Sequence, residues 1–357
     1  MSIYDNYSTI GKNTVTSTRS EFTKLIGIDG MKDIIKKVLL GGNVRDITEF
    51  ITQRRLLNSY ASTLDLFVNT LYNDTTSIPK YTSKITNDLI NSKGNAKILD
   101  LWLLGLTKKG LDNIVRTEAN IKDYQDKFSS LISETINDLE SKFGQLSGNI
   151  TINNSQIELN WNIISLLFIA LGSQTLTIRG SSKSMNGKLF EKLVLGSLLS
   201  ISGFTYHSEP PTEIKPTDKI FWLSNMDENE REVDATIVYN GTAISIDIGF
   251  IGKGNPEITL DKVTRFGAYK EIGGIKHDMS TIIIVDTVGE NSDLFNKARR
   301  VNGSVLQMKN NDWVLEFIKL ICEKFDITHE LLQITNENLE CYLSKAMEPI
   351  DIDSFIN

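Results

Sequence analysis

The sequence predicts an α+β protein in which a mostly helical region precedes an α/β/α domain with a mixed central sheet. The first observation is apolar spacing of three and four residues through residues 29–143, which is typical of amphipathic helices. The second is a change near residue 149 to short runs that alternate or are rich in Ile and Val. The third is the order of patterns from residue 184 on, which is helix, strand, strand, helix, strand, strand, helix.

The composition is that of a folded protein. The 357 residues include 40% hydrophobic and 23% charged side chains, as in ordinary globular domains. The patterns divide the chain into a helical region over 1–148, an α/β/α domain over 149–325 and a tail with a short helix over 326–357. No apolar run reaches the ~18–20 residues of a membrane span. The N-terminus lacks a basic segment followed by an apolar core, so we expect a cytoplasmic protein.

Cysteine and histidine are too scarce to support several classes of chemistry. Cys322 and Cys341 are too far apart in sequence for a zinc site or a disulfide framework, which fits a reducing compartment. The 3 histidines show no ligand spacing, which disfavours zinc sites and catalytic triads. The net charge of −7 argues against nucleic-acid binding over the whole surface. It does not exclude a local basic cleft, because Arg179, Lys183, Lys188 and Lys192 cluster in one stretch.

Three amphipathic helices are predicted in the N-terminal region. The first covers 29–42 and stops at its two glycines, the second begins near Asn43, and the third ends near Gly144. We expect the apolar stripe of each helix to pack against other helices. The second stripe consists of Ile47, Phe50, Ile51, Leu57, Tyr60, Ala61, Leu64, Phe67, Val68 and Leu71.

The segment that follows predicts a short hairpin and two separate helices. Alternation around a polar turn indicates the hairpin over 149–161. The apolar run over 162–171 predicts a short buried helix. A second helix, over 184–204, has an apolar stripe and a plausible stop at Gly203.

Glu191 lies beside the apolar stripe of the second of these helices. One interpretation is a glutamate at the rim that pairs with Lys188 or Lys192. The other is a carboxylate that points toward a functional site.

Two aspartates flank the strongest turn signal in the chain. Asn240-Gly241 favours a two-residue hairpin loop, because this pair tolerates positive φ at both positions. The resulting register places Asp234 opposite Asp247 on a face of small residues. Like charges in such a position destabilise a sheet, so a divalent metal is the expected compensation. The alternative is an ordinary hairpin whose aspartates face solvent and hinder edge aggregation.

The remaining patterns complete the α/β/α domain. A helix is predicted over 259–274, a buried strand over 280–289, another strand over 304–309 and a helix over 311–325. Buried strands rich in Ile and Val are expected to lie inside the sheet.

Residues 184–309 resemble the PD-(D/E)XK nuclease superfamily, and within it the type II restriction endonucleases. The resemblance rests on "NGKLFEKLVLGSLL", "VDATI" and "IDIGFIGKGNPEITLDKVTRF". It makes Asp234 the first acid of the motif, Asp247 the second, and Glu191 the helix glutamate near the metal. The sequence departs from the motif where its lysine is expected, because Gly249 stands there.

The resemblance implies a site-specific endonuclease that hydrolyses phosphodiester bonds with Mg²⁺. Asp234 and Asp247 would hold the metal. Lys253, or Lys262 on the next predicted helix, would replace the missing lysine. Glu257 would assist a second metal or cap a helix, and Gln307 is a possible neighbour of the active site.

The partners implied are double-stranded DNA and a second copy of the chain. Arg179, Lys183 and Lys188 would contact DNA, and the N-terminal helices would serve recognition or dimerisation. No nucleotide cofactor is expected, because Gly180 and Gly187 are spaced too widely for a P-loop. Two alternatives remain open: a structure-specific nuclease of repair or transposition, and a DNA-binding protein whose degenerate hairpin no longer binds metal.

Overall fold

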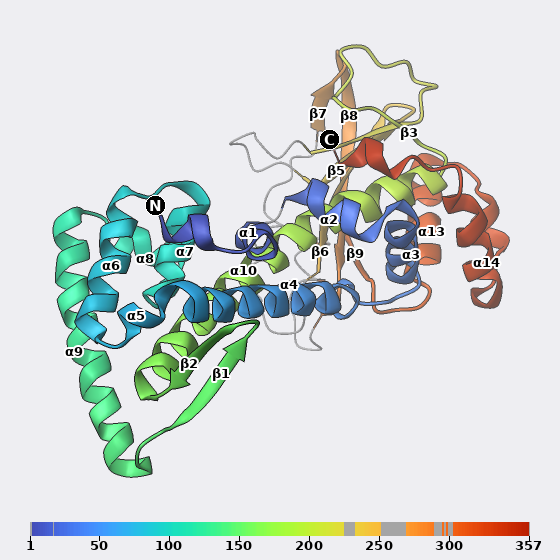
Figure 1. Ribbon diagram of the computed structural model, residues 1–357. Helices are drawn as coiled ribbons and strands as arrows, with labels where there is room; N and C mark the ends of the chain where they lie inside the picture. The colour runs from blue at the N-terminus through green and yellow to red at the C-terminus, as the bar shows by residue number, and fades with distance from the viewer. Residues whose placement is uncertain are drawn as a thin grey trace. The chain divides into compact units, whose positions relative to one another are not determined.

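The computed structural model describes residues 2–16, 18–224, 233–250, 269–288 and 303–356, together with Phe295 and Ala298. The chain forms two compact units, shown in Figure 1, and each unit is built from two segments. The first unit consists of Met1–Thr18 and Glu49–Ser184, and the second of Arg19–Thr48 and Met185–Asn357. These units differ from the ranges expected from the sequence, because the hairpin after residue 148 packs with the N-terminal helices.

The first unit is mostly helical, as the sequence predicts. Its core includes Trp102, Tyr81 and Phe67. The longest helix that lies wholly within it ends near the expected place, since Gly144 follows with a φ of 81° that glycine adopts without strain. In chain order the unit contains η1 (Ile3–Asn6), α1 (Thr9–Val15), most of α4 (Val44–Leu66), η2 (Phe67–Leu71), α5 (Tyr72–Thr75), α6 (Ile78–Asn91), α7 (Gly94–Leu103), α8 (Lys108–Asn113), α9 (Glu118–Phe143), β1 (Gly148–Ile152), β2 (Ser155–Leu159) and the first part of α10 (Trp161–Ile201).

The apolar stripe expected on the second N-terminal helix is buried at its end, where Phe67, Val68 and Leu71 lie in η2, but it is not the buried face of α4. Phe50 is 77% exposed and Leu57 is 66% exposed. The buried face includes Thr52 and Ser59 instead. The Ser59 hydroxyl donates a hydrogen bond to the amide oxygen of Gln174 on α10 at 3.1 Å. The expectation was wrong for α4 because hydrogen bonds between buried polar groups can hold a helix face that hydropathy alone assigns to solvent.

The two helices expected over 162–171 and 184–204 are one continuous helix, α10, of 41 residues. Its glycines do not break it, because a glycine inside a helix costs only about 1 kcal/mol relative to alanine. Burial of side chains such as Ile178 and Leu193 offsets that cost. By length and composition alone α10 is also apolar enough to cross a membrane, a test that buried core helices pass as well.

The second unit contains a mixed sheet of seven described strands. The order is β3-β4-β5-β6-β8-β7, and β9 also pairs with β8, along the C-terminal part of that strand, whereas β7 pairs with its start. The β6–β8 and β8–β9 pairs are parallel, whereas β4–β5 and β5–β6 are antiparallel. The strands are β3 (Thr205–Tyr206), β4 (Ile220–Leu223), β5 (Ala235–Tyr239), β6 (Thr242–Gly249), β7 (Tyr269–Ile272), β8 (Ile275–Val285) and β9 (Gly303–Gln307).

Helices cover one face of this sheet. The Phe221 ring lies 6.3 Å from that of Phe355, and a Cβ on Gly196 of α10 would meet the same Phe355 ring. Tyr239 contacts Phe325, with ring centroids 6.1 Å apart. The helices of this unit are α2 (Arg19–Ile26), α3 (Ile28–Leu39), the second part of α10, α13 (Trp313–Phe325), η3 (Glu330–Gln333), α14 (Asn336–Met347) and η4 (Ile352–Phe355).

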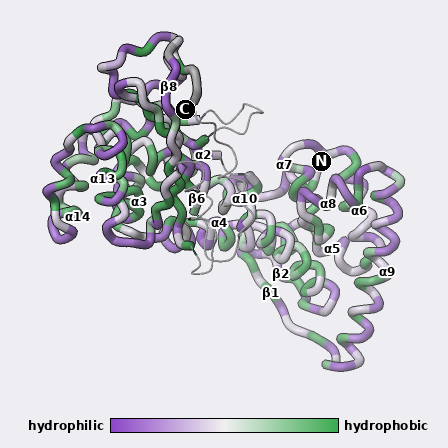
Figure 2. Tube along the Cα trace, turned by 180° about the vertical axis from the view of Figure 1, so that it is seen from behind, coloured by the Kyte–Doolittle hydropathy of each residue, from purple (hydrophilic) through white to green (hydrophobic). Residues whose placement is uncertain are grey.

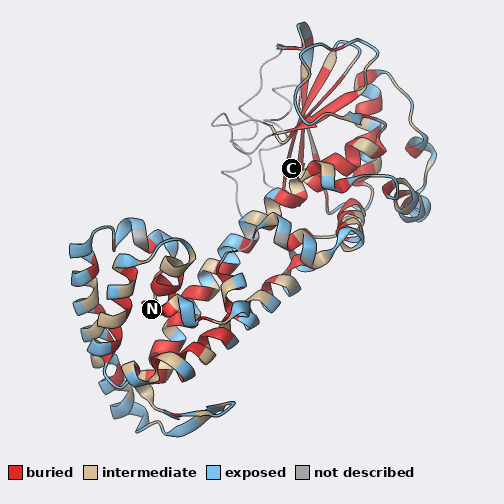
Figure 3. Ribbon diagram, turned by 45° about the horizontal axis from the view of Figure 1, so that its top comes forward, coloured by how far each residue is buried: buried red, intermediate tan, exposed pale blue. Residues whose placement is uncertain are grey.

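The opposite face of the sheet carries the aspartates at one end and an apolar cluster at the other. Trp222 and Val238 pack there with Ile214 and Ile272. The strands are therefore buried on both sides, as Figure 3 shows, and their hydrophobic residues stand out in Figure 2. A mixed sheet with helices and a preceding helical region is the architecture that the sequence predicts.

One predicted element is wrong in part. The described end of the helix expected over 259–274 is strand β7, which pairs with the start of β8 through a tight hairpin. Gly273 and Gly274 form its turn with φ of 57° and 74°. The sequence favours a strand here once the turn is recognised, because paired glycines at positive φ are typical of two-residue hairpin loops.

Candidate active site

The hairpin of β5 and β6 has the register that the sequence predicts. Tyr239 pairs with Thr242, and the ladder continues to Ala235 and Ile246. At the turn, Asn240 and Gly241 have φ of 48° and 75°. Both values are positive, as a two-residue loop that matches the twist of the strands requires.

Asp234 lies directly before β5, one position beyond the ladder. Its Oδ2 accepts a hydrogen bond from the backbone N–H of Ile248 at 2.8 Å. Its carbonyl oxygen accepts the N–H of Ser224 at 3.1 Å. These bonds hold Asp234 between the ends of β4 and β6, so its half-buried carboxylate has a defined position.

Asp247 lies inside β6, where the register places it beside Asp234. It is 2% exposed. It therefore lies beneath the surface of the site rather than in its wall, whereas the sequence treats the two aspartates as equivalent.

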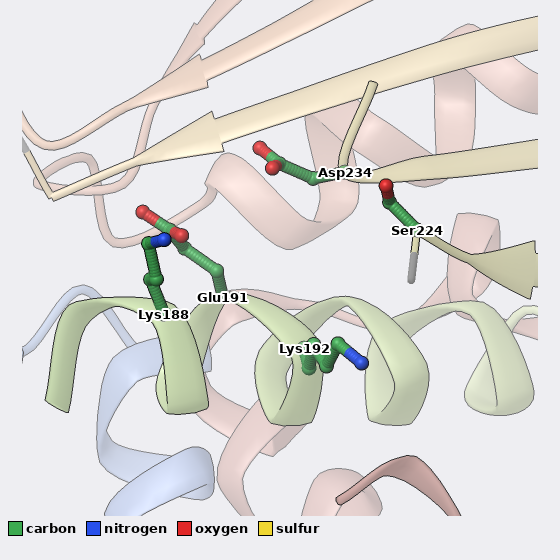
Figure 4. A pocket seen from close by; sticks show the side chains of 5 residues that line it. All are labelled: Lys188, Glu191, Lys192, Ser224 and Asp234. Carbon is green, nitrogen blue, oxygen red and sulfur yellow. The ribbon is translucent and has the colours of Figure 1, made fainter. Parts of the chain in front are cut away.

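A pocket of about 120 Å³ opens at this edge of the sheet. Its lining residues are Asp234, Ser224 and three residues of α10, which are Lys188, Glu191 and Lys192. Figure 4 shows Glu191 and Lys188 rising from α10 toward Asp234, while Lys192 points away from them. The structure thus brings together Asp234 and Glu191, which the sequence separates by a helix end, a loop and two strands.

The donor set of the pocket suits one hard divalent cation. Two carboxylates and a serine hydroxyl are oxygen ligands, and Mg²⁺ commonly takes one or two carboxylates with water and phosphate oxygens. The pocket is large enough for a metal ion with several waters. No group of three or more His, Cys, Asp or Glu side chains arranged for metal binding occurs among the described residues. A metal here would therefore rely on water and substrate for its other ligands.

The other residues singled out from the sequence are dispersed. Lys253, Glu257 and Lys262 lie outside the described residues. Gln307 ends β9, and its side-chain oxygen accepts the N–H of Val288 at 2.8 Å, so it holds the loop after β8.

The predicted DNA-contacting residues all belong to α10. Arg179 is paired with Glu49 of α4 at 2.9 Å. The hydrogen bond from Arg179 is the main cause that lowers the pKa of the half-buried Glu49 carboxyl. Lys183 lies on the helix, with its side chain outside the described part. Lys188 is exposed and lines the pocket.

Sequence reasoning missed three residues near this edge. Lys192 was considered as part of a local basic stretch and as a partner of Glu191 but not as a site residue, and Ser224 directly follows strand β4, for which no element was predicted. Asp286 follows β8, and its N–H bonds to the Gly249 carbonyl oxygen at 3.2 Å. The sequence contains a signal for Asp286, because this acid directly follows the apolar run "TIIIV". It therefore stands at the carboxyl end of a parallel strand.

Comparison with known proteins points to one family. The family model of the CfrBI restriction endonuclease matches residues 29–293. The type II restriction enzyme CfrBI of Citrobacter freundii is 36% identical over 345 residues, which cover 95% of this chain and 94% of that enzyme. No solved structure matches the chain. With three quarters of the chain matched by the model and nearly all of it aligned with one enzyme, the protein belongs to the CfrBI restriction endonuclease family.

Proposed function

We propose that this protein is a type II site-specific deoxyribonuclease that hydrolyses phosphodiester bonds in double-stranded DNA with Mg²⁺. The observation that carries the proposal is the convergence of Asp234 and Glu191 with two lysines in one pocket. Membership of a restriction endonuclease family supports it. On this proposal the mixed sheet is a PD-(D/E)XK nuclease-like core, and the enzyme serves a restriction–modification system in the cytoplasm.

The carboxylates have distinct parts in this proposal. Asp234 and Glu191 hold Mg²⁺ from the pocket wall, and Asp247 supports the ion from the buried strand beside Asp234. A bound Mg²⁺ lowers the pKa of a coordinated water and offsets charge that develops on the phosphate. The N–H of Ile248 holds one carboxylate oxygen of Asp234 in place at the pocket that this residue lines.

A cation is needed beside the scissile phosphate, and Lys188 is the best described source. Gly249 occupies the strand position expected for a lysine, and its neighbours Ile248 and Phe250 are buried apolar residues. Lys188 reaches toward Asp234 from α10 and forms no salt bridge with any described residue. Its ammonium group would neutralise phosphate charge or orient the attacking water. Lys253 and Lys262 remain the candidates proposed from sequence.

Substrate contacts beyond the pocket follow from the basic residues of α10. Arg179 and Lys183 would bind DNA phosphates with Lys188, which requires Arg179 to exchange Glu49 for a phosphate. We further propose a homodimer, because a two-fold symmetric enzyme matches a palindromic site and cuts both strands.

The test is cleavage of phage DNA with and without Mg²⁺, using isosteric variants. Asp234→Asn keeps the oxygen that accepts the Ile248 N–H but removes the charge, and Glu191→Gln does the same for the helix carboxylate. Each should reduce the cleavage rate by about 10³-fold, which corresponds to about 4 kcal/mol of lost stabilisation of the transition state. Asp278→Asn, an exposed aspartate near the start of β8, is the matched control and should cut normally.

The pattern of products separates the proposal from its alternatives. Discrete bands that need Mg²⁺ support a site-specific enzyme. Cutting that follows DNA structure rather than sequence would favour a repair or transposition nuclease. DNA binding without cutting under any metal condition, unchanged in both carboxylate variants, would favour a degenerate binding protein.

A further inference from the structure

Lys192 is a cation in the wall of the Asp234 pocket that the proposed chemistry does not use. It lies four residues after Lys188 on α10, and both lysines line the pocket. Lys188 is exposed, whereas Lys192 is half-buried. Because packing along the stem of a lysine limits the directions that its ammonium group can take, Lys192 presents its charge to a narrower region. The pocket therefore has two cationic positions with different surroundings.

The two lysines lie on different sides of the pocket. Figure 4 shows Lys192 on the Ser224 side, whereas Lys188 lies on the side toward which the Asp234 carboxylate points. The N–H of Ser224 donates to the carbonyl oxygen of Asp234 at 3.1 Å, so Ser224 keeps a defined place beside the acid. Lysine and serine side chains are both common donors to DNA phosphate oxygens. Lys192 and Ser224 thus form a second polar position beside Asp234.

The charges of the pocket leave room for both lysines to act on DNA. Asp234 and Glu191 are the carboxylates of the wall, and one Mg²⁺ would offset both of them. Each phosphate of a DNA strand carries one negative charge. The ammonium groups of Lys188 and Lys192 together then match two phosphates rather than one.

The spacing of the two lysines also matches that of phosphates in one strand. Residues four apart lie on the same face of a helix, about 6 Å apart along its axis. Successive phosphates of a DNA strand rise by about 3.4 Å along the axis and turn by about 34° around it, which separates them by about 6–7 Å. Two neighbouring phosphates of the same strand can therefore meet one lysine each.

We propose that Lys192 and Ser224 bind the phosphate next to the scissile one in the cut strand. Lys188 then serves the scissile phosphate, and Lys192 holds the strand in register with Asp234. This inference rests on the proposed function, because it requires a strand that is cut at this pocket.

The two lysines should differ in the kinetic step that they affect. The neighbouring phosphate keeps its charge throughout the reaction, so its contacts are equally strong in the ground state and the transition state. Such contacts lower the half-saturating concentration without changing the rate at saturation. Lys192 is therefore a positioning residue whose loss is separable from the loss of Lys188.

The test is single-turnover cleavage at increasing concentrations of the full chain, with Mg²⁺ and a duplex that contains one cleavage site mapped in phage DNA. Lys192→Gln should raise the half-saturating concentration by about 10-fold and Ser224→Ala by about 3-fold, with the saturated rate changed by less than about 2-fold. Lys192→Arg keeps the cation and should stay within about 3-fold of the wild type. Lys319→Gln, at an exposed lysine of α13, is the control and should behave like the wild type.

Uncharged methylphosphonate linkages identify the phosphate that Lys192 binds. One linkage replaces the neighbour of the scissile phosphate on its 5′ side, or on its 3′ side, in both strands. At one of these two positions it should raise the half-saturating concentration of the wild type by about 10-fold but that of Lys192→Gln by less than about 2-fold, because the variant has already lost the contact. A lysine that only stabilises the fold would not produce this coupling.

Circular dichroism establishes that each variant is folded. Lys192→Gln that reaches half-saturation like the wild type, or that responds to both neutral linkages as the wild type does, would overturn the inference while wild-type cleavage upholds the proposed function. A lower saturated rate with an unchanged half-saturating concentration would also overturn it, since Lys192 would then act on the scissile phosphate or the metal. A wild type that cuts no DNA would overturn the proposed function and this inference with it.

Discussion

Asp100 of α7 couples the stability of the first unit to pH. Its side chain is 1% exposed. Burial raises the pKa of this carboxyl to about 7, although the Ser92 side chain opposes the shift. An aspartate in an unfolded chain has a pKa of about 3.9. The stability that the protonated group provides is therefore fully present below about pH 4 and is lost as the pH rises to about 7, at about 1.4 kcal/mol per pH unit.

Replacement of this carboxyl by an amide isolates its contribution. Asp100→Asn has nearly the same shape but does not ionise, so its unit should not lose this stability with rising pH. From pH 5 to pH 8 the wild type should lose about 2.7 kcal/mol more unfolding free energy than the variant. The loss occurs over the two pH units between pH 5 and the pKa of about 7, at about 1.4 kcal/mol for each. Above pH 7 the difference should stay constant.

Hydrogen exchange of peptides from α7 measures this local free energy at each pH, after correction for intrinsic exchange rates. Asp112→Asn, at an exposed position on α8, is the control and should follow the wild type. If Asp100→Asn loses as much protection as the wild type between pH 5 and pH 8, burial does not hold a proton on Asp100 and the reasoning is refuted.

Three further predictions concern the second unit. Gly196→Ala places a Cβ 2.6 Å from the Phe355 ring, so it should reduce the free energy of unfolding by about 1–3 kcal/mol in urea. Gly241→Ala should cost about 1 kcal/mol in the same assay, because φ is 75° there; an unchanged midpoint would mean that the turn adapts. Lys188→Ala should lower the single-turnover cleavage rate by about 10²-fold while the affinity for DNA is nearly unchanged. If Lys192→Ala lowers the cleavage rate equally, neither lysine acts on the phosphate.

Local patterns were sufficient to predict the hairpin that carries Asp234. The Asn240-Gly241 loop fixes which residues pair, and period-two alternation then fixes the face of each side chain. Helix α3 was predicted equally well, because the apolar stripe from Met31 to Leu39 is its buried face. Both elements depend on neighbours within a few positions, and such information is present in a short window of sequence.

The pocket and the buried face of α4 required tertiary structure. Glu191 has equal reasons in sequence to pair with a neighbouring lysine or to face a site, and only the packing of α10 beside the end of β5 points it toward Asp234. In α4, the buried face was decided by hydrogen bonds such as that of Ser59 to Gln174, a partner 115 residues away. The sequence by itself thus determined the strand register, the paired acids and the family, since these follow from local conformation and residue identity. Contacts between distant segments decided which groups meet at the site. The energies of these contacts depend on a three-dimensional geometry that no local pattern contains.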